Sequence, residues 1–416
     1  MRNGTNKRPK MMHRSHREEA PPDERGLCTR AGNLNTLRFR PVLSHFFCGI
    51  IFALLLSRSL FGETLYDLGS FAGSNSAGSG VNNSGQVVGE STTAGNAQHA
   101  FLYSGGVMSD LGTFGGSSSG ALGINNSGQV VGHASNASNS FAFLYSGGVM
   151  NNLGTLPGGN TSVGRGINDS GQVTGFSTSG GNSNAHAFLY SGGVMSDLGT
   201  LGGIASVGYG INSSGQVVGL SNPTGNLGVH AFLYSGGVMN DLGTLGGTAS
   251  VGRAINNAGQ VVGSSATGVG LDHAFLYSGG VMSDLGTLGG IMSAGYGINN
   301  SGQVVGSSKI AGNADHAFLY SGGVMSDLNT LYAGLLSDGV SVGFTSFFRA
   351  TAISDNGLIV GEGEYFDGVS QYSYRGFMLD TQIVSSVPDG GDTLGLLMLS
   401  MVGFMAFCRR GIVSKP

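Results

Sequence analysis

The sequence is poor in several residue types on which other folds depend. Among 416 residues it has no tryptophan, 8 prolines and 3 cysteines, and only 10% of its residues are charged. The cysteines are Cys28, Cys48 and Cys408, so the long middle of the chain has neither a disulfide framework nor a thiolate metal site. What it has instead is 78 glycines without a collagen period, which is typical of tight turns and close-packed strands.

Positive charge and catalytic motifs are also scarce. Residues 64–386 contain 5 basic and 16 acidic residues, a net charge near −11, so a nucleic acid is not an expected partner. The sequence has no Gly-x-Ser-x-Gly elbow, P-loop, His-Glu-x-x-His or calcium-loop pattern. We therefore predict no cofactor and no metal site, and calcium has no motif to support it.

One unit of about 43 residues recurs along most of the chain. It is built around the string His-Ala-Phe-Leu-Tyr-Ser-Gly-Gly-Val-Met-Ser-Asp-Leu-Gly, and only the last copy is stretched. A repeat of this length must stack on its neighbours to bury a core, so it determines the architecture. The copies of its Asp-Leu-Gly element begin at Asp67, Asp110, Asn152, Asp197, Asp241, Asp284 and Asp327.

The unit at residues 273–315 predicts four short strands and two hairpins. Residues 273–277 and 281–285 are rich in strand formers and flank a Ser-Gly-Gly turn. Residues 293–298 and 303–307 flank an Asn-Asn-Ser-Gly turn in the same way. Four strands per unit match a propeller blade, whereas a β-solenoid needs shorter coils and a helical repeat needs a helical period that is absent.

The two ends of the repeat region supply complementary halves of one hairpin. Residues 64–69 have the sequence of its second half, and residues 375–380 that of its first half. Pairing them would complete a seventh blade and remove the exposed edges of an open array. We therefore predict an all-β, seven-bladed, monomeric β-propeller over residues 63–386, closed by its N- and C-terminal strands.

The unit resembles the extracellular HAF repeat family, which is named for the string His-Ala-Phe. Six copies match closely, although Phe141 replaces the histidine in the second copy and the last copy reads Arg375-Gly376-Phe377. The resemblance implies secretion and repetition and brings no established activity with it.

The N-terminal end has the order of a secretory signal peptide. Arg38 and Arg40 precede an apolar run at residues 46–56, and residues 57–62 follow, with small residues at Ser57, Ser59 and Gly62, where we expect cleavage. We interpret residues 1–62 as a leader and signal peptide with a hydrophobic helix. The alternative is a buried helix of a cytosolic fold.

The C-terminal end combines a short motif, an apolar run at residues 394–408 that we interpret as a transmembrane helix, and an arginine pair. This order resembles the PEP-CTERM type of sorting signal, with Asp-Gly-Gly where the family name has Glu-Pro. The resemblance covers most of residues 387–416. It implies an exosortase-like processing enzyme, transient inner-membrane contact and a final place at the cell surface or outside the cell. An ordinary tail anchor is the alternative. The motif and the pair are Val387, Pro388, Asp389, Gly390, Gly391, Arg409 and Arg410.

Histidines and aspartates recur once per blade, so a ring would hold them apart and no metal could gather them. We expect the imidazoles to satisfy backbone groups at a strand start and the carboxylates to order the turn beside them. The histidines are His99, His186, His230, His273 and His316.

Arginine and tyrosine alternate at one position of the strand expected to line the channel. This position lies two residues before the isoleucine or valine that ends the strand. We predict a cationic and aromatic collar at the channel mouth that suits an anionic sugar. The alternative is that these side chains only pack between blades. The residues are Ser79, Leu122, Arg165, Tyr209, Arg253 and Tyr296.

The last unit contains two insertions, at residues 329–349 and 362–374, which we expect to be loops on the same face as the variable loops. Their aromatic and acidic residues are typical of a carbohydrate or calcium surface, but they would also suit a plug at the closure seam. The candidate ligand-binding residues are Arg349, Glu364, Tyr365, Asp367 and Tyr372.

These observations favour a non-catalytic, exported cell-surface or biofilm-matrix protein, whose propeller binds exopolysaccharide or proteins. The competing hypothesis is a secreted glycan-active enzyme, a hydrolase or lyase, that uses Glu362, Glu364 and Asp367 of the last unit.

Overall fold

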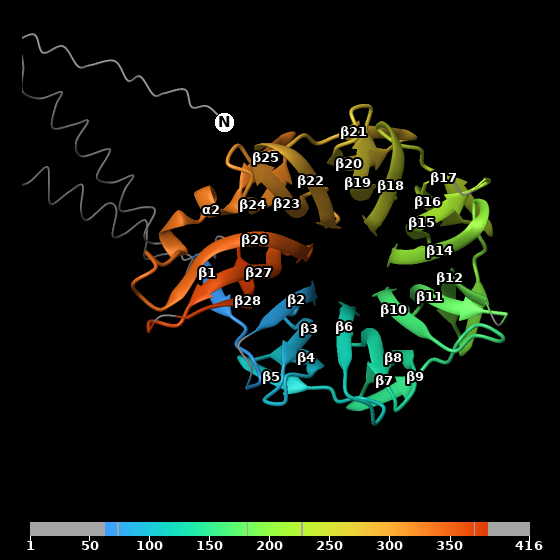
Figure 1. The fold of residues 1–416 in the computed structure, drawn as a ribbon, viewed down its shortest axis with the longest axis horizontal. Helices are drawn as coiled ribbons and strands as arrows, with labels where there is room; N and C mark the ends of the chain where they lie inside the picture. The colour runs from blue at the N-terminus through green and yellow to red at the C-terminus, as the bar shows by residue number, and fades with distance from the viewer. Residues whose placement is uncertain (1–62, 73–74, 181, 226–227, 370, 382–416) are drawn as a thin grey trace, which may run out of the picture. The chain divides into compact units, whose positions relative to one another are not determined.

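Seven four-stranded antiparallel sheets surround a central axis, so the chain forms a seven-bladed β-propeller (Figure 1). The computed structural model describes residues 63–381 except 73–74, 181, 226–227 and 370. The prediction of an all-β propeller is confirmed. The proposed leader, at residues 1–62, and the proposed sorting segment, at residues 387–416, lie outside the described residues. Within the described part, no helix has the length and apolar character needed to cross a membrane.

Blades 1 to 6 are continuous stretches of chain, each running from the innermost strand to the outermost. Blade 1 is formed by β2 (Ser76–Val81), β3 (Val87–Thr92), β4 (Gln98–Ser104) and β5 (Val107–Asp110). Blade 2 is formed by β6 (Ser119–Ile124), β7 (Val130–Ser135), β8 (Ser140–Ser146) and β9 (Val149–Asn152). Blade 3 is formed by β10 (Ser162–Ile167), β11 (Val173–Ser179), β12 (Asn182–Ser191) and β13 (Val194–Asp197).

The next three blades repeat this order. Blade 4 is formed by β14 (Gly202–Ile211), β15 (Val217–Pro223), β16 (His230–Ser235) and β17 (Val238–Asp241). Blade 5 is formed by β18 (Gly246–Ile255), β19 (Val261–Thr267), β20 (Asp272–Ser278) and β21 (Val281–Asp284). Blade 6 is formed by β22 (Gly289–Ile298), β23 (Val304–Ile310), β24 (Asp315–Ser321) and β25 (Val324–Asp327).

Blade 7 is built from both ends of the propeller, as the split hairpin predicts. Its inner three strands are β26 (Gly343–Ile353), β27 (Leu358–Phe366) and β28 (Tyr372–Asp380), and its outermost strand is β1 (Thr64–Asp67). β1 pairs with β28 from Thr64 opposite Asp380 to Asp67 opposite Phe377 (Figure 1). Arg375 Nη1 also donates to Asp67 Oδ2 at 2.6 Å across this pair.

The blades are joined by asparagine side chains at the turn between their first two strands. Asn82 Nδ2, for example, donates to the backbone carbonyl of Asn125 in the next blade at 3.1 Å. At the closure, Asn299 Nδ2 donates to the carbonyl of Ser354, and Asn356 Nδ2 donates to that of Asn83. The donors of the regular bonds are Asn82, Asn125, Asn168, Asn212, Asn256 and Asn299.

A serine at the start of the innermost strand makes a second joint near the opposite face. Ser119 Oγ accepts from the backbone N–H of Ala100 in the preceding blade at 2.9 Å and donates to the carbonyl of Gly112 at 2.6 Å. Since Ala100 belongs to the His-Ala-Phe string and Gly112 to Asp-Leu-Gly, the repeat's two most regular segments both serve to hold blades together.

Every innermost strand has a β-bulge. The bulge brings the two strands so close that the facing residue of the second strand has to be a glycine. In blade 5 the register shifts between Gly252 and Ala254, so Arg253 is the extra residue. A Cβ on the paired Gly263 would overlap the carbonyl oxygen of Val251. This close approach of two backbones explains the glycine in the Val-Val-Gly string.

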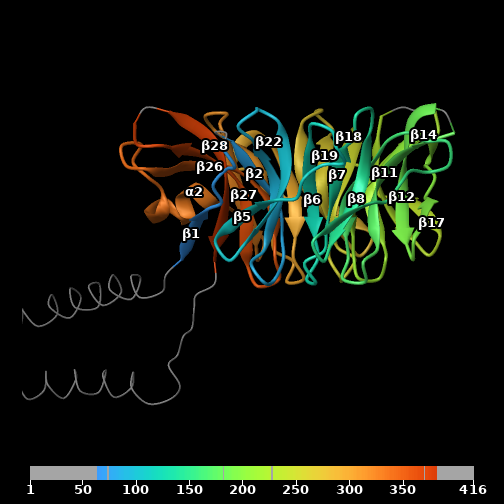
Figure 2. The same ribbon diagram turned by 90° about the horizontal axis from the view of Figure 1, so that it is seen from below.

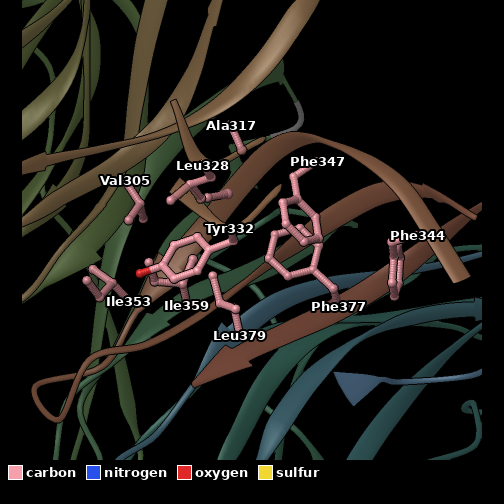
Figure 3. Packing of buried hydrophobic residues seen from close by; sticks show 11 residues of the cluster. Val305, Ala317, Leu328, Tyr332, Phe344, Phe347, Ile353, Ile359, Phe377 and Leu379 are labelled. Atoms are coloured by element: carbon pink, nitrogen blue, oxygen red, sulfur yellow. The ribbon is translucent and has the colours of Figure 1, made fainter. Parts of the chain in front are cut away.

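Each His-Ala-Phe phenylalanine is fully buried, and the last blade adds further rings. Phe347 and Phe377 lie 4.5 Å apart between ring centroids, and Phe344 and Tyr332 belong to the same buried cluster (Figure 3). Tyr332 follows a short helix, α2 (Leu328–Leu331), and precedes the 3-10 turn η1 (Ala333–Leu335).

The two insertions of the last unit are therefore not simply loops, and that expectation was wrong. Residues 343–349 lie in β26 because Phe344 and Phe347 turn into the core, and residues 362–366 lengthen β27. Only residues 367–371 connect β27 to β28. Much of the inserted sequence serves the closure of the ring.

Deleting residues 64–70 should destabilise the whole propeller, because it exposes the edge of β28 and removes the buried Leu68. We expect the melting temperature, followed by circular dichroism, to fall by about 10 °C or more. Moving the same residues behind Thr381 through a short glycine linker should restore it. A truncated chain with an unchanged melting temperature would contradict the closure.

Gly263→Ala should destabilise the protein by about 1–3 kcal/mol or more, because two paired backbones leave no room for a Cβ. The matched control is Gly268→Ala, at a glycine with no atom within 4 Å of a Cβ. Chemical denaturation of both variants checks this, and equal stabilities would refute the role of the bulge.

Candidate functional site

The two faces of the ring differ in what their connections carry. One face, which we call the turn face, carries the tight Asn-x-x-Gly and Ser-Gly-Gly turns. The other, the variable face, carries the loops between the second and third strands, such as residues 268–271 and 311–314. Viewed from the side, the strands run between these two faces (Figure 2). Loops on a rigid scaffold are where binding usually resides.

The bulge residues make up the predicted collar, with one member per blade. A β-bulge re-aims a side chain, and here it does so on the strands closest to the channel axis (Figure 1). We call this place the bulge position. Its residues are Ser79, Leu122, Arg165, Tyr209, Arg253, Tyr296 and Thr351.

A second variable position follows the glycine that faces the bulge, and sequence reasoning missed it. It adjoins the bulge position within a blade: Arg165 lies 5.5 Å from the ring of Phe176, and Ser307 Oγ lies 3.4 Å from Tyr296 Oη. Aligning the repeats with one another would have revealed it, since the residues around it hardly change. This post-glycine position holds Glu90, His133, Phe176, Leu220, Ser264, Ser307 and Glu362.

The alternating arginines and tyrosines come together as one continuous arc over blades 3 to 7. The Arg165 guanidinium lies 4.6 Å from the centre of the Tyr209 ring, and Arg253 lies 5.8 Å from Tyr209 and 5.0 Å from Tyr296. Arg349 extends the arc, 6.0 Å from Tyr296. We call Arg165, Tyr209, Arg253, Tyr296 and Arg349 the Arg–Tyr arc. Its contacts are within the range of cation–π attraction.

The positive charge of the arc is only partly compensated. Arg349 donates to Glu362 Oε1 at 2.6 Å, but no carboxylate in the described part of the chain pairs with Arg165 or Arg253. The Nε atoms of all three arginines are buried without a hydrogen-bond partner among the described residues. Burial lowers the pKa of Arg165, and the charge of Arg253 acts in the same direction. The arc is a place where a bound anion would be stabilised.

Blades 7, 1 and 2 present a different chemistry at the post-glycine position. Burial raises the pKa of Glu90, and the negative charge of Glu362 raises it further, while Arg349 opposes this. Burial lowers the pKa of His133, whose Nδ1 has no hydrogen-bond partner among the described residues. The mouth therefore has a basic sector and an acidic sector.

The remaining candidates of the last unit have local partners. Glu364 Oε2 accepts from Thr345 Oγ1 at 2.8 Å, and Asp367 Oδ1 accepts from the backbone N–H groups of Val369 and Gln371. Tyr365 packs edge-on against Phe344, with ring centroids 5.2 Å apart. Tyr372 is half exposed and rests on Phe366. The structure brings none of these four into the Arg–Tyr arc.

The recurring histidines pair with the recurring aspartates. The prediction that their imidazoles satisfy backbone groups at a strand start was therefore wrong. His273 Nδ1 lies 2.8 Å from Asp284 Oδ2, and the other four pairs are alike. The second oxygen, Asp284 Oδ1, accepts from the N–H of Gly286, as expected for a turn-ordering carboxylate. No group of three or more histidine, cysteine or acidic side chains suited to a metal occurs among the described residues.

Comparison with known proteins finds only distant structural likenesses. No family model and no curated protein matches the sequence. TolB from Acinetobacter baumannii is 14% identical with a TM-score of 0.42, over 70% of this chain and 71% of that one. A puromycin-hydrolyzing peptidase of Mycobacterium tuberculosis is 12% identical with a TM-score of 0.45, over 79% of this chain and 54% of that one. The six-bladed lectin of Aleuria aurantia is 12% identical with a TM-score of 0.34, over 64% of this chain and 94% of that one.

Glu90→Gln should change how stability depends on pH. Because the folded protein holds the Glu90 proton more tightly than the unfolded chain, whose pKa is near 4.5, the wild type should lose stability relative to the variant as pH rises from 4.5 through the raised pKa. Urea denaturation across this range measures the difference. Ser307→Ala, at the equivalent position of blade 6, should keep the wild-type dependence. If the difference in unfolding free energy between the wild type and Glu90→Gln did not change with pH, the burial of this carboxyl would be contradicted.

Proposed function

We propose that this chain is an exported, non-catalytic cell-surface or biofilm-matrix protein whose propeller binds an acidic exopolysaccharide on its variable face. The Arg–Tyr arc carries the proposal. It offers two arginines without a carboxylate partner among the described residues, alternating with aromatic rings along five consecutive blades. Nothing in the packing of a propeller requires such an alternation, since the bulge position holds serine, leucine and threonine in blades 1, 2 and 7.

The arc suits a polymer of sugar acids in two ways. A guanidinium group binds a carboxylate through paired hydrogen bonds, and such charge-assisted bonds are stronger than neutral ones. The tyrosine rings between the arginines offer apolar faces to the sugar rings that link the acid groups. A ligand with acid groups at regular intervals can meet Arg165 and Arg253 together, so its affinity gains from multivalency.

Export and sorting rest on the sequence outside the described residues. The signal-peptide order at residues 1–62 and the motif at residues 387–391 support passage across the inner membrane and handling by an exosortase-like enzyme. The strand ends Thr64 and Asp380 are paired with each other at the turn face. The described part of the chain therefore begins and ends at the turn face, opposite the variable face.

Local pairing of the acids favours binding over hydrolysis in the last unit. Glu362 is the counter-ion of Arg349, Glu364 accepts from Thr345, and Asp367 orders its own turn. A glycan-active enzyme that uses these three acids would have to break such contacts to donate or accept protons.

Arg253→Gln should weaken binding to polygalacturonate by about tenfold, because one charge-assisted contact is worth about 1.5–3 kcal/mol. The Arg165→Gln, Arg253→Gln double variant should abolish measurable binding, and added salt should weaken the binding of the wild type. Isothermal titration calorimetry checks this, with neutral dextran as the negative ligand.

The matched control is Lys309→Gln, which removes one positive charge that is paired with Asp315 and lies outside the arc. It should change the affinity by less than about twofold, as expected for a screened surface charge. Equal weakening by Lys309→Gln and Arg253→Gln would show that only net charge matters. A wild type that does not bind polygalacturonate would overturn the proposed ligand class.

A further inference from the structure

A cavity of about 550 Å³ opens at the seam where blades 7 and 1 meet. Its size is within the range of small-molecule sites, roughly 300–1,000 Å³. It lies in the acidic sector of the mouth, away from Arg165 and Arg253. The residues that matter for its chemistry are Glu90, Gln98, Phe348, Glu362 and Tyr374.

An aromatic pair forms one wall of this seam cavity. Phe348 from β26 and Tyr374 from β28 pack edge to face, with ring centroids 5.4 Å apart. The backbone N–H of Tyr374 donates to Asn75 Oδ1 at 3.2 Å, which ties this strand to the start of blade 1. Tyr374 remains 59% exposed. A large aromatic surface that the fold leaves open is suited to stacking against a sugar ring.

Three carboxylates line the same cavity, and that of Asp315 is already paired with Lys309, at 2.7 Å. Glu362 already has a counter-ion, since its Oε1 lies 2.6 Å from Arg349 Nη2. Glu90 has no counter-ion among the described residues. None of them makes a hydrogen bond or an ion pair to its carboxylate, although the side chain is half-buried. A half-buried anion next to a second anion is stabilised by a cation placed between them.

We propose that the seam cavity binds a protonated amino sugar, whose ring stacks on Tyr374 and whose ammonium group contacts the Glu90 carboxylate beside Glu362. An ammonium group supplies three donors, enough to contact both glutamates, and Gln98 offers an amide for a ring hydroxyl. The site meets the Arg–Tyr arc at the Arg349–Glu362 ion pair, and its ligand carries the opposite charge to the acidic ligand proposed for the arc.

A metal ion explains the cavity less well than an amine. Calcium takes about six to eight oxygen ligands, whereas three carboxylates line this cavity and two of them already have a counter-ion, Glu362 in Arg349 and Asp315 in Lys309. The aromatic wall would contribute nothing to a hard cation, but it attracts an organic one through cation–π contact.

The burial of Glu90 predicts how the affinity depends on pH. Only the ionised carboxylate attracts an ammonium group, and the pKa of Glu90 is raised by burial and by Glu362. Affinity for an amine should therefore increase as pH rises through the pKa of Glu90, as long as the amine stays protonated.

The test compares two oligosaccharides with the same sugar rings, the trimer of glucosamine, whose amines are protonated, and its N-acetylated counterpart, whose amides are neutral and carry an added acetyl group. At a pH between the pKa of Glu90 and that of the amine, calorimetry should show the glucosamine trimer binding to the full-length protein at least about tenfold more tightly. Glu90→Gln should remove this preference. Ser264→Gln, which places the same side chain at the post-glycine position of blade 5, should preserve it.

A second variant separates stacking from charge. Tyr374→Ala should weaken both trimers by a similar factor, because the ring contacts the sugar and not the amine, and Arg253→Gln should weaken neither. Equal affinity of the wild type for the two trimers, binding of neither, or a preference that survives Glu90→Gln would each overturn the proposal. Loss of polygalacturonate binding alone would count only against the proposed function.

Discussion

An asparagine in the first turn of each blade holds the ring together, at the first residue of the turn in blades 1 to 6 and at Asn356 in blade 7. Its side chain reaches the backbone of the next blade, and its own oxygen accepts from the turn beside it, as Asn82 does with Ser84 and Gln86. Each bond contributes about 1 kcal/mol at most, but leaving one buried partner unsatisfied costs about 1–3 kcal/mol. Each blade therefore depends on the next, and only a closed ring satisfies all of them. This explains why the last blade borrows β1 from the other end of the chain.

The same constraint separates the residues that hold the ring from those that are free to differ. The turns, the paired glycines and the His-Ala-Phe strings are nearly identical in every blade because each has a neighbour to satisfy. The bulge and post-glycine positions are not tied to one repeated hydrogen bond, and there the blades differ in charge, size and aromatic character. The resulting mouth has a basic sector along the Arg–Tyr arc and an acidic sector at the seam between blades 7 and 1.

Much of the fold could be predicted from the sequence, because the repeated unit shows where each blade and its strands begin. The strand order and the closure by residues 64–69 could be predicted, and so could the alternation of Arg165, Tyr209 and Arg253. The inserted strands of blade 7 could not, because bulges in β26 let Phe344 and Phe347 face inward at a spacing that does not alternate. The proximity of Glu90 and Glu362 could not either, because they are far apart in sequence and meet only once the ring has closed.

The central claim is that recognition occurs at the bulge and post-glycine positions, together with Arg349 and Tyr374 of blade 7, and that the rest of the propeller is scaffold. A variant with serine at every bulge and post-glycine position tests it most directly, since Ser79, Ser264 and Ser307 show that both positions accept serine. Its thermal unfolding and its binding to polygalacturonate and to the glucosamine trimer would be measured together. We predict a cooperative transition close to that of the wild type and no binding of either ligand. Retained binding, or a chain that no longer folds, would contradict the account.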